Sequence, residues 1–152
     1  MKISIFGTGY VGLVTGASLA NLGHDVLCVD VDEKKIHLIN SGEMPFYEPG
    51  LKELVLKNKE RTRLIFSTDI EGAVHFAEVI FNCVGTPMKD DGSAELKYVF
   101  DVTKKVALSA KEYKVLINKS TVPPGTAKKC QELITKTNPE AKIDLVSNPE
   151  FL

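Results

Sequence analysis

Short apolar runs alternate along the chain with longer segments in which apolar residues recur every three to four positions. The short runs predict buried strands of a parallel sheet, because such strands are covered on both faces and need no polar side. The longer segments predict amphipathic helices that lie on the sheet. The expected strands span 2–6, 25–30, 63–67, 78–84, 114–120 and 143–147, and the expected helices span 10–22, 33–40, 50–58, 70–76, 95–110 and 126–137.

This alternation predicts an α/β fold of the Rossmann type, in which six strands form a doubly wound parallel sheet between two helical layers. Right-handed connections then favour the strand order 3-2-1-4-5-6. We expect one domain over residues 1–152, a length that can bury a full core. Ligands of such sheets bind beyond the carboxyl ends of the strands, so functional residues are expected there.

Composition narrows the classes of partner. The chain is 43% apolar and 26% charged with a net charge of −1, and its lysines and glutamates are interspersed. No basic face is predicted, which argues against nucleic acid and anionic membrane as partners. No apolar stretch approaches the roughly 20 residues of a membrane span, and no signal peptide is recognisable, so we expect a cytoplasmic protein.

Cysteine and histidine positions suggest no metal site. The chain has three cysteines, Cys28, Cys83 and Cys130, and three histidines, His24, His37 and His75. The cysteines are widely spaced, and two of them fall inside strand-like runs, so buried thiols are favoured over disulfides or metal ligands. The histidines lack metal-ligand spacing and are expected at the surface or its boundary.

The first strand runs into "FGTGYVG", which carries three glycines at the spacing of a dinucleotide-binding turn. In such a turn Gly7 permits the sharp bend, Gly9 lets the backbone approach a pyrophosphate, and Gly12 lets the helix lie close to the strand. Free N–H groups at the helix start would face the phosphates. A purely structural bend between strand and helix is the alternative.

An acidic residue at the end of the second strand supports the dinucleotide interpretation. Asp30 follows Gly12 by eighteen residues, close to the spacing of a carboxylate that accepts the adenosine ribose hydroxyls. With Asp32 nearby and no arginine in "DVDEKK", a 2′-phosphate would be repelled, which favours NAD over NADP. Lys35 is either a ligand contact or a solvated helix residue. A methyltransferase also ends this strand with an acid, but its glycine loop has a different spacing.

Polar residues follow three further strands at the same predicted edge. Gly85 and Thr86 follow the fourth strand and could contact a phosphate or ribose, or Thr86 could only end the strand through a local bond. Ser120 and Thr121 follow the fifth strand and could orient water or substrate, or only satisfy backbone groups before a helix. Glu150 follows the sixth strand and is expected to face the same crevice.

One loop is rich in proline, glycine and aromatic residues. The segment 42–50, "GEMPFYEPG", carries Phe46 and Tyr47. Exposed aromatic rings are costly, so we expect both to pack over the second helix rather than to wall a site.

Seven strings in register resemble the N-terminal domain of the UDP-glucose/GDP-mannose dehydrogenase family: "FGTGYVGLVTG", "VDVDEKKI", "PFYEPGL", "CVGTP", "DGSAEL", "KSTVPPGT" and "SNPEFL". The resemblance covers the whole chain. It implies an oxidoreductase that uses NAD in two successive oxidations of a sugar C6 alcohol to the carboxylate, through a covalent adduct on a cysteine. UDP-glucose is the substrate that the resemblance favours, with UDP-glucuronate as the product that feeds polysaccharide biosynthesis.

The resemblance also implies roles for individual residues. The NAD contacts that it implies are Gly7, Thr8, Gly9, Tyr10, Val11, Gly12, Asp30, Lys35, Val84, Gly85, Thr86, Pro87, Ser120 and Thr121. Thr121 is similar to a family threonine that helps to position the catalytic water. Glu150 is similar to a family glutamate that acts in acid/base catalysis and helps to position water. Glu150, Phe151 and Leu152 match the start of a substrate-contacting segment, whereas "PFYEPGL" implies no chemical role.

The family's catalytic cysteine, lysine and aspartate have no counterpart in this sequence. They belong to a later domain, so we expect a truncated form of a longer protein that binds NAD but does not oxidise UDP-glucose alone. The full protein is expected to be a homodimer and the 152-residue chain a monomer. GDP-mannose and UDP-N-acetylmannosamine remain alternative substrates, and a non-catalytic module that senses the NAD/NADH ratio is the alternative from another class.

Overall fold

The structure is a computed structural model that describes residues 1–151, and it confirms the alternation of strands and helices. The strands are β1 (Lys2–Phe6), β2 (Asp25–Val29), β3 (Leu64–Ser67), β4 (Val79–Asn82), β5 (Lys114–Asn118) and β6 (Ile143–Ser147). The helices are α1 (Tyr10–Asn21), α2 (Glu33–Asn40), α3 (Leu51–Glu60), α4 (Ile70–Phe76), α5 (Lys97–Ser109) and α6 (Thr126–Thr137).

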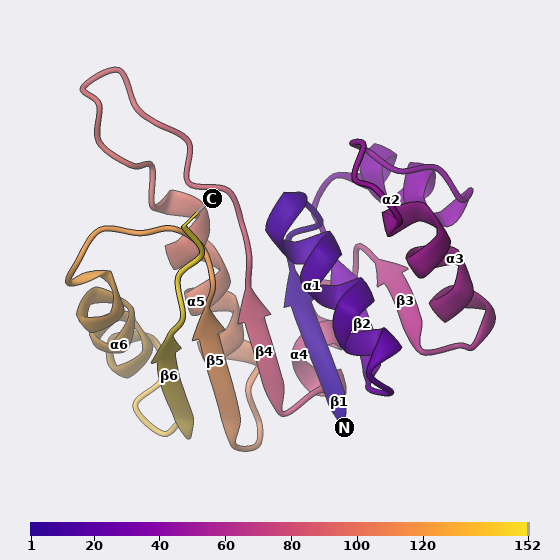
Figure 1. Cartoon of the computed structure of the whole chain (residues 1–152). Helices are drawn as coiled ribbons and strands as arrows, with labels where there is room; N and C mark the ends of the chain where they lie inside the picture. The colour runs from indigo at the N-terminus through magenta and orange to yellow at the C-terminus, as the bar shows by residue number, and fades with distance from the viewer. Residues whose placement is uncertain (152) are drawn as a thin grey trace.

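The strands form one parallel sheet in the order β3-β2-β1-β4-β5-β6, as the sequence predicts. At its centre Ile5 of β1 pairs with Cys28 of β2 on one side and with Phe81 of β4 on the other. Because all the strands run the same way, their carboxyl ends lie at one edge, the upper edge in Figure 1. The order reverses between β1 and β4, and this is the position where doubly wound sheets bind ligands.

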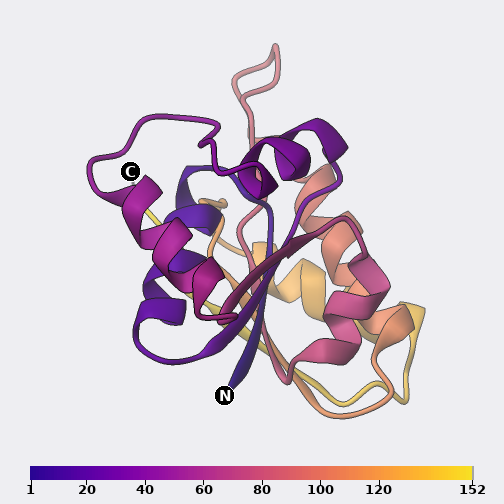
Figure 2. The same cartoon turned by 90° about the vertical axis from the view of Figure 1, so that its right-hand side faces the viewer.

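Helices cover both faces of the sheet (Figure 2). One core joins α1, α2 and α3 to β1, β2 and β3, with Leu13, Ile39 and Val55 fully buried in it. The other joins α4, α5 and α6 to the opposite face of the sheet, from Val29 of β2 and Phe6 of β1 to β6, with Val106 and Leu116 fully buried. Buried apolar area of this kind is the main favourable term in folding.

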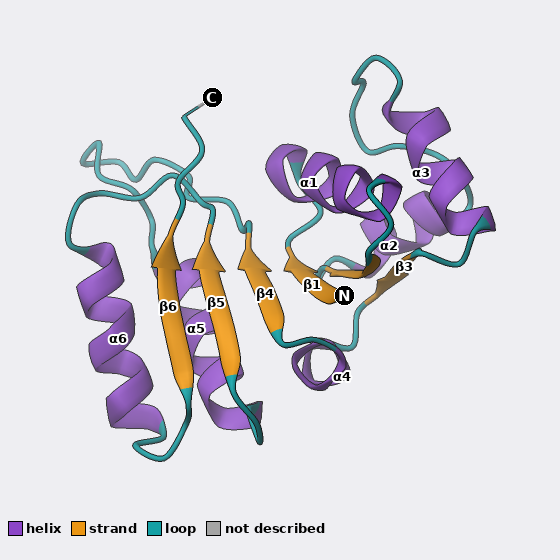
Figure 3. Ribbon diagram, turned by 60° about the horizontal axis from the view of Figure 1, so that its bottom comes forward, coloured by secondary structure: helices purple, strands orange, loops and turns teal. Residues whose placement is uncertain are grey.

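Half of one sheet face carries no helix among residues 1–151. In Figure 3, α5 and α6 lie behind β4, β5 and β6, while the front of these strands is open. Alternate residues of β5 and β6 point to this open side, and Val115 and Ile117 are half-buried while Val146 is 40% exposed. A parallel sheet is normally covered on both faces, so this apolar surface is unusual.

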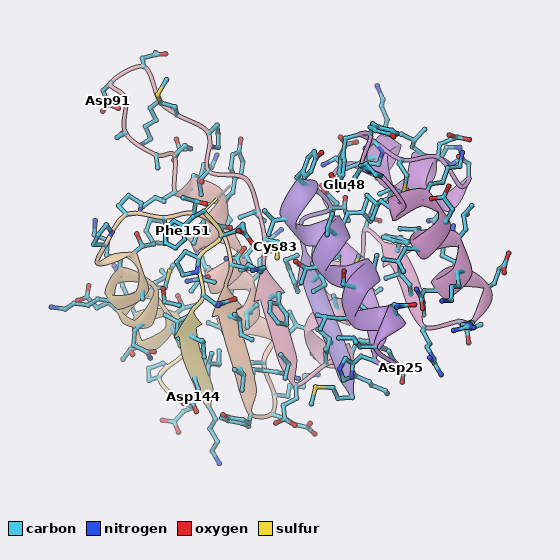
Figure 4. The ribbon with its side chains drawn as sticks, viewed as in Figure 1. Asp25, Glu48, Cys83, Asp91, Asp144 and Phe151 are labelled. Carbon is cyan, nitrogen blue, oxygen red and sulfur yellow. The ribbon has the colours of Figure 1, made fainter. Side chains whose placement is uncertain are left out.

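The elements differ from the expectation mainly at their ends. The strand expected over 78–84 ends at Asn82, and the helix expected over 95–110 spans Lys97–Ser109. Between them a hairpin with a bridge between Met88 and Ala94 projects above the sheet, with Asp91 at its tip (Figure 4). Apolar periodicity does not mark where a chain leaves the sheet, because the residues that follow β4 are still apolar.

The expectation for the 42–50 loop is correct for one aromatic residue and wrong for the other. Phe46 packs against the core that contains Ile36 and Ile39 of α2, and it also stacks on Tyr10 of α1. Tyr47, by contrast, is 83% exposed. The two rings are neighbours in the sequence, but only Phe46 reaches the core.

Candidate functional site

The turn between β1 and α1 depends on two glycines for its shape. Gly7 has a φ of +97° and donates its N–H to the carbonyl oxygen of Val29 at 2.8 Å. This φ disfavours any residue with a Cβ. A Cβ on Gly12 would collide with the carbonyl oxygen of Gly7 and lie 3.2 Å from the Cβ of Cys83. The structure therefore confirms the packing roles that the sequence predicts for both residues.

Neither backbone conformation nor packing inside the protein requires a glycine at the middle position of the turn. Gly9 has an ordinary φ of −76°, and a Cβ built on it would meet no protein atom within 4 Å. Gly85, after β4, likewise has open space at its Cβ position. Both face the cavity described below, so a missing side chain leaves room there for another molecule. This is the arrangement that a dinucleotide lying close to the backbone needs.

Asp30 lies just beyond the end of β2 and connects that end to the glycine turn. Its Oδ2 accepts the backbone N–H of Thr8 at 2.9 Å, the Thr8 hydroxyl at 2.8 Å and the Lys35 Nζ at 2.9 Å. Its Oδ1 accepts the N–H of Asp32 at 3.1 Å. The carboxylate is thus held in place by four donors from three residues.

The same contacts decide the ionisation of Asp30, which is only 8% exposed. Partial burial by itself would raise the pKa of this carboxyl group, but the hydrogen bonds from Lys35, Thr8 and Asp32 outweigh burial and hold the pKa below its ordinary value. Asp30 is therefore an anion at neutral pH, and a fixed anion suits ribose hydroxyls and repels a 2′-phosphate.

The loops that follow β4 and β5 are joined by hydrogen bonds. The Thr86 hydroxyl donates to the carbonyl oxygen of Thr121 at 2.8 Å, and the Ser120 hydroxyl donates to the carbonyl oxygen of Val84 at 2.6 Å. Both bonds cross from one loop to the other. The Thr86 hydroxyl therefore does not make the local bond within its own turn that was the alternative for it. Two loops separated by more than thirty residues thus form one wall.

A cavity of about 650 Å³ lies at the carboxyl edge of the sheet, where the order of the strands reverses. It falls within the range of pockets that hold small molecules and cofactors. The predicted residues that line it are Gly7, Gly9, Tyr10, Val11, Asp30, Lys35, Val84, Gly85, Thr86, Ser120 and Thr121. The structure brings these residues together from four separate parts of the chain. Thr8 and Gly12 are buried behind the turn and support it.

One whole wall of the cavity was not predicted from the sequence. Tyr98, Asp101, Val102 and Lys105 of α5 line it, as does Ile70 at the start of α4. The four α5 residues recur at helical spacing on one face, and this periodicity is a signal that could have marked them. It does not say which face of the sheet α5 covers, and that depends on the strand order.

Two residues of the predicted substrate segment, Glu150 and Phe151, are not part of the cavity lining. Within the described residues, the lining includes neither Pro87 nor Glu150, so the facing of Glu150 toward the crevice stays a prediction. Glu150 pairs with Lys119 at 3.3 Å, and its carbonyl oxygen accepts the Thr121 hydroxyl. Phe151 is 82% exposed, and the predicted Leu152 lies outside the described residues.

The thiols behave as buried apolar groups. All three cysteines are free and buried, as predicted. Burial raises the pKa of Cys83 to about 12, so this thiol, which faces the cavity, is neutral at physiological pH. His37 and His75 are exposed and His24 is half-exposed. Within residues 1–151 no group of three or more histidine, cysteine or acidic side chains could hold a metal ion.

Comparison with known proteins decides the family. The profile described as "UDP-glucose/GDP-mannose dehydrogenase family, NAD binding domain" matches residues 1–152. The chain belongs to the UDP-glucose/GDP-mannose dehydrogenase family. Because the matching profile is that of the NAD-binding domain, NAD is the cofactor of this domain, and the glycine turn with Asp30 and the open space at Gly9 fits it.

Curated relatives and solved structures agree with the family. The chain is 46% identical to a UDP-glucose 6-dehydrogenase of Rhizobium meliloti over its full length and 35% of that protein. It is 47% identical to the UDP-glucose 6-dehydrogenase TuaD of Bacillus subtilis over 99% of this chain and 33% of that protein. The chain thus spans about a third of the length of these relatives.

Among solved structures, a GDP-mannose dehydrogenase from Pseudomonas aeruginosa matches all of the chain and 36% of its own, with 39% identity and a TM-score of 0.95. A UDP-glucose dehydrogenase from Pyrobaculum islandicum matches 99% of the chain and 36% of its own, with 35% identity and a TM-score of 0.92. The described part of the chain has no helix that is long and apolar enough to cross a membrane.

Proposed function

We propose that this chain is the cofactor half of an NAD-dependent UDP-glucose 6-dehydrogenase. The reaction oxidises the C6 alcohol of UDP-glucose to the carboxylate of UDP-glucuronate with two NAD. The observation that carries the cofactor half is the cavity at the sheet edge, where Gly9 and Gly85 leave open space beside the fixed anion Asp30. The curated relatives at 46% and 47% identity support UDP-glucose as the substrate.

The two halves of NAD would occupy different parts of the cavity. The adenosine ribose would meet Asp30, whose position is held by Thr8 and Lys35. The pyrophosphate would cross Gly9 and accept N–H groups from the start of α1. The nicotinamide would lie toward Thr86 and Thr121, because their loops form the wall beyond β4 and β5.

Thr121 and Glu150 are the residues of this chain that we assign to the chemistry. Thr121 would help to position the catalytic water, and Glu150 would take part in acid/base work and water positioning. The direct contact between the Thr121 hydroxyl and the Glu150 carbonyl oxygen supports a common role. Lys119 holds the Glu150 side chain outside the cavity lining, beside this wall. Glu150 and Phe151 would therefore meet the nucleotide sugar from the side away from the adenosine.

Further protein would complete the active site. The open apolar face of β4, β5 and β6, with Val115, Ile117 and Val146, offers a packing surface for it. The three cysteines of this chain are buried, so the nucleophile of the reaction would come from that further protein. We therefore expect the 152 residues alone to bind NAD without turning over UDP-glucose, and the whole protein to be a homodimer.

GDP-mannose and UDP-N-acetylmannosamine are the alternative substrates. The structure with a TM-score of 0.95 is a GDP-mannose dehydrogenase, and a UDP-N-acetylmannosamine dehydrogenase of Staphylococcus aureus gives 0.88 at 29% identity. The fold of this domain is thus shared by enzymes with different sugars. This is expected where the cofactor domain does not read the sugar.

Calorimetric titration of the chain with NAD and NADP tests the cofactor proposal. We expect NAD to bind and NADP to bind roughly tenfold more weakly, because its 2′-phosphate meets the Asp30 anion. Gly9→Val should abolish NAD binding without unfolding the chain, because its side chain fills the open space at the turn. Asp25→Asn, at the opposite end of the strands, is the control (Figure 4). Equal affinity for both cofactors, or unchanged binding by Gly9→Val, would contradict the proposal.

A further inference from the structure

The first turn of α1 has no capping side chain, although in the proposed function it binds a pyrophosphate. Gly9 is the N-cap residue and offers no side chain to the free N–H groups, and the first turn contains no acidic residue. Helices that start without a capping side chain lose a stabilising interaction exactly where their N–H groups are unpaired. Asp30 holds the preceding residue, Thr8, and a separate set of contacts holds Tyr10.

Tyr10, the first residue of α1, is held instead by the 42–50 loop. Its ring stacks on Phe46 with the centroids 4.3 Å apart and the planes at 19°. Its hydroxyl lies 2.9 Å from Oε2 of Glu48 and 3.1 Å from the carbonyl oxygen of Tyr47, so two acceptors share one proton. Figure 4 shows Glu48 beside this end of α1. The hydrogen bond to Glu48 also raises the pKa of Tyr10, so its hydroxyl keeps the proton that it donates.

The loop is itself fixed to the body of the domain. Met44 and Phe46 pack against the core beneath α1, α2 and α3. Glu43 pairs with Lys52 of α3 at 3.0 Å, and the N–H of Leu51 bonds to the carbonyl oxygen of Glu48 at 3.1 Å. A tether to this loop therefore ties Tyr10 to the core.

The 42–50 loop contacts a residue that lines the cavity. Within the described residues Tyr10 lines the cavity, whereas Phe46 and Glu48 do not. We propose that Phe46 and Glu48 are positioning residues, which hold the first turn of α1 through Tyr10 so that its N–H groups meet the cofactor pyrophosphate. This inference rests on the proposed function, and it gives a role to the "PFYEPGL" segment.

The test compares ligands that do and do not contain the pyrophosphate, using the 152-residue chain and calorimetric titration. Phe46→Ala should lower the affinity for NAD and for ADP-ribose about three- to tenfold, a range set by the strength of an aromatic pair. The affinity for adenosine, which lacks phosphate, should change by less than about twofold. Phe46→Tyr keeps the stack and should restore binding. Glu48→Gln keeps an acceptor for Tyr10 and should bind better than Glu48→Ala.

Tyr47→Ala is the matched control, because Tyr47 is in the same loop and 83% exposed, and its contact with Tyr10 uses only the backbone. Hydrogen exchange gives a second measure without ligand. The Leu13 amide bonds to the carbonyl oxygen of Gly9 at 2.9 Å, and it should exchange faster in Phe46→Ala but not in Tyr47→Ala.

Three outcomes separate this inference from the proposed function. Selective loss of ADP-ribose binding with faster Leu13 exchange supports the positioning role. Wild-type affinity in Phe46→Ala, or equal loss of ADP-ribose and adenosine, overturns it. Failure of the unaltered chain to bind either NAD or ADP-ribose overturns the proposed function, and the positioning role falls with it.

Discussion

Replacing Asp30 by asparagine tests whether the site is held in place by a carboxylate. Both oxygens of Asp30 accept backbone N–H groups, from Thr8 on one side and Asp32 on the other. An asparagine has one oxygen and one NH₂ group, so in either orientation it turns a donor toward one of these N–H groups. It also removes the charge that pairs with Lys35. Asparagine therefore cannot reproduce the native contacts although its size is the same.

The expected loss of stability follows from these contacts. With its oxygen turned to the buried Thr8 N–H, asparagine loses the acceptor for the Asp32 N–H and the charged bond to Lys35, and a hydrogen bond to a charged group is worth about 1.5–3 kcal/mol. We expect Asp30→Asn to lower the free energy of unfolding by roughly 2 kcal/mol at neutral pH. For a domain of this size that corresponds to a fall in Tm of roughly 4–8 °C. Urea unfolding of both proteins, followed by circular dichroism, measures the difference.

The pH dependence has a definite sign. The pKa of Asp30 in the folded chain is below its ordinary value of 3.8, so its stabilising effect is present above that value. The effect is lost as pH falls through the lowered pKa, because protonated Asp30 no longer accepts from both sides. The difference in the free energy of unfolding between the unaltered chain and Asp30→Asn should thus be constant near neutral pH and smaller at about pH 3.

Asp25→Asn is the control for this experiment. Asp25 begins β2, at the other end of the strand that precedes Asp30, and it is exposed. Its replacement should change the free energy of unfolding by less than about 0.5 kcal/mol. A difference below about 0.5 kcal/mol for Asp30→Asn, or one that is unchanged in acid, would refute the reasoning.

Three further predictions follow from single contacts. Gly12→Ala should lower the free energy of unfolding by about 1–3 kcal/mol in urea, because its Cβ meets the Gly7 carbonyl, whereas Gly85→Ala should change it little. Equal effects would contradict this. All three cysteines should resist a thiol reagent in the native chain and react after unfolding, because they are buried; rapid native labelling would exclude it. Asp69→Ala removes the bond to the Gly72 N–H that caps α4 and should cost about 1 kcal/mol, while Asp69→Asn should cost less.

Local patterns in the sequence determined the elements and their arrangement. Apolar runs and helical periods are set by residues that are neighbours along the chain, and the strand order is that of the doubly wound fold which this alternation indicates. The glycine spacing and Asp30 located one end of the cavity for the same reason. Gly7 and Gly12 had the packing roles that their positions predict.

Tertiary structure decided which residues of different elements meet. Only the folded sheet places Asp101 and Lys105 of α5 on the cavity, joins Thr86 to Thr121, and keeps Glu150 beside Lys119 outside the lining. The exposure of Tyr47 and the stack of Phe46 on Tyr10 could not be predicted from the sequence either. Such contacts depend on the path of the backbone in loops, where no periodicity shows which way a side chain points. The sequence thus located the edge of the site, and packing across the sheet determined its walls.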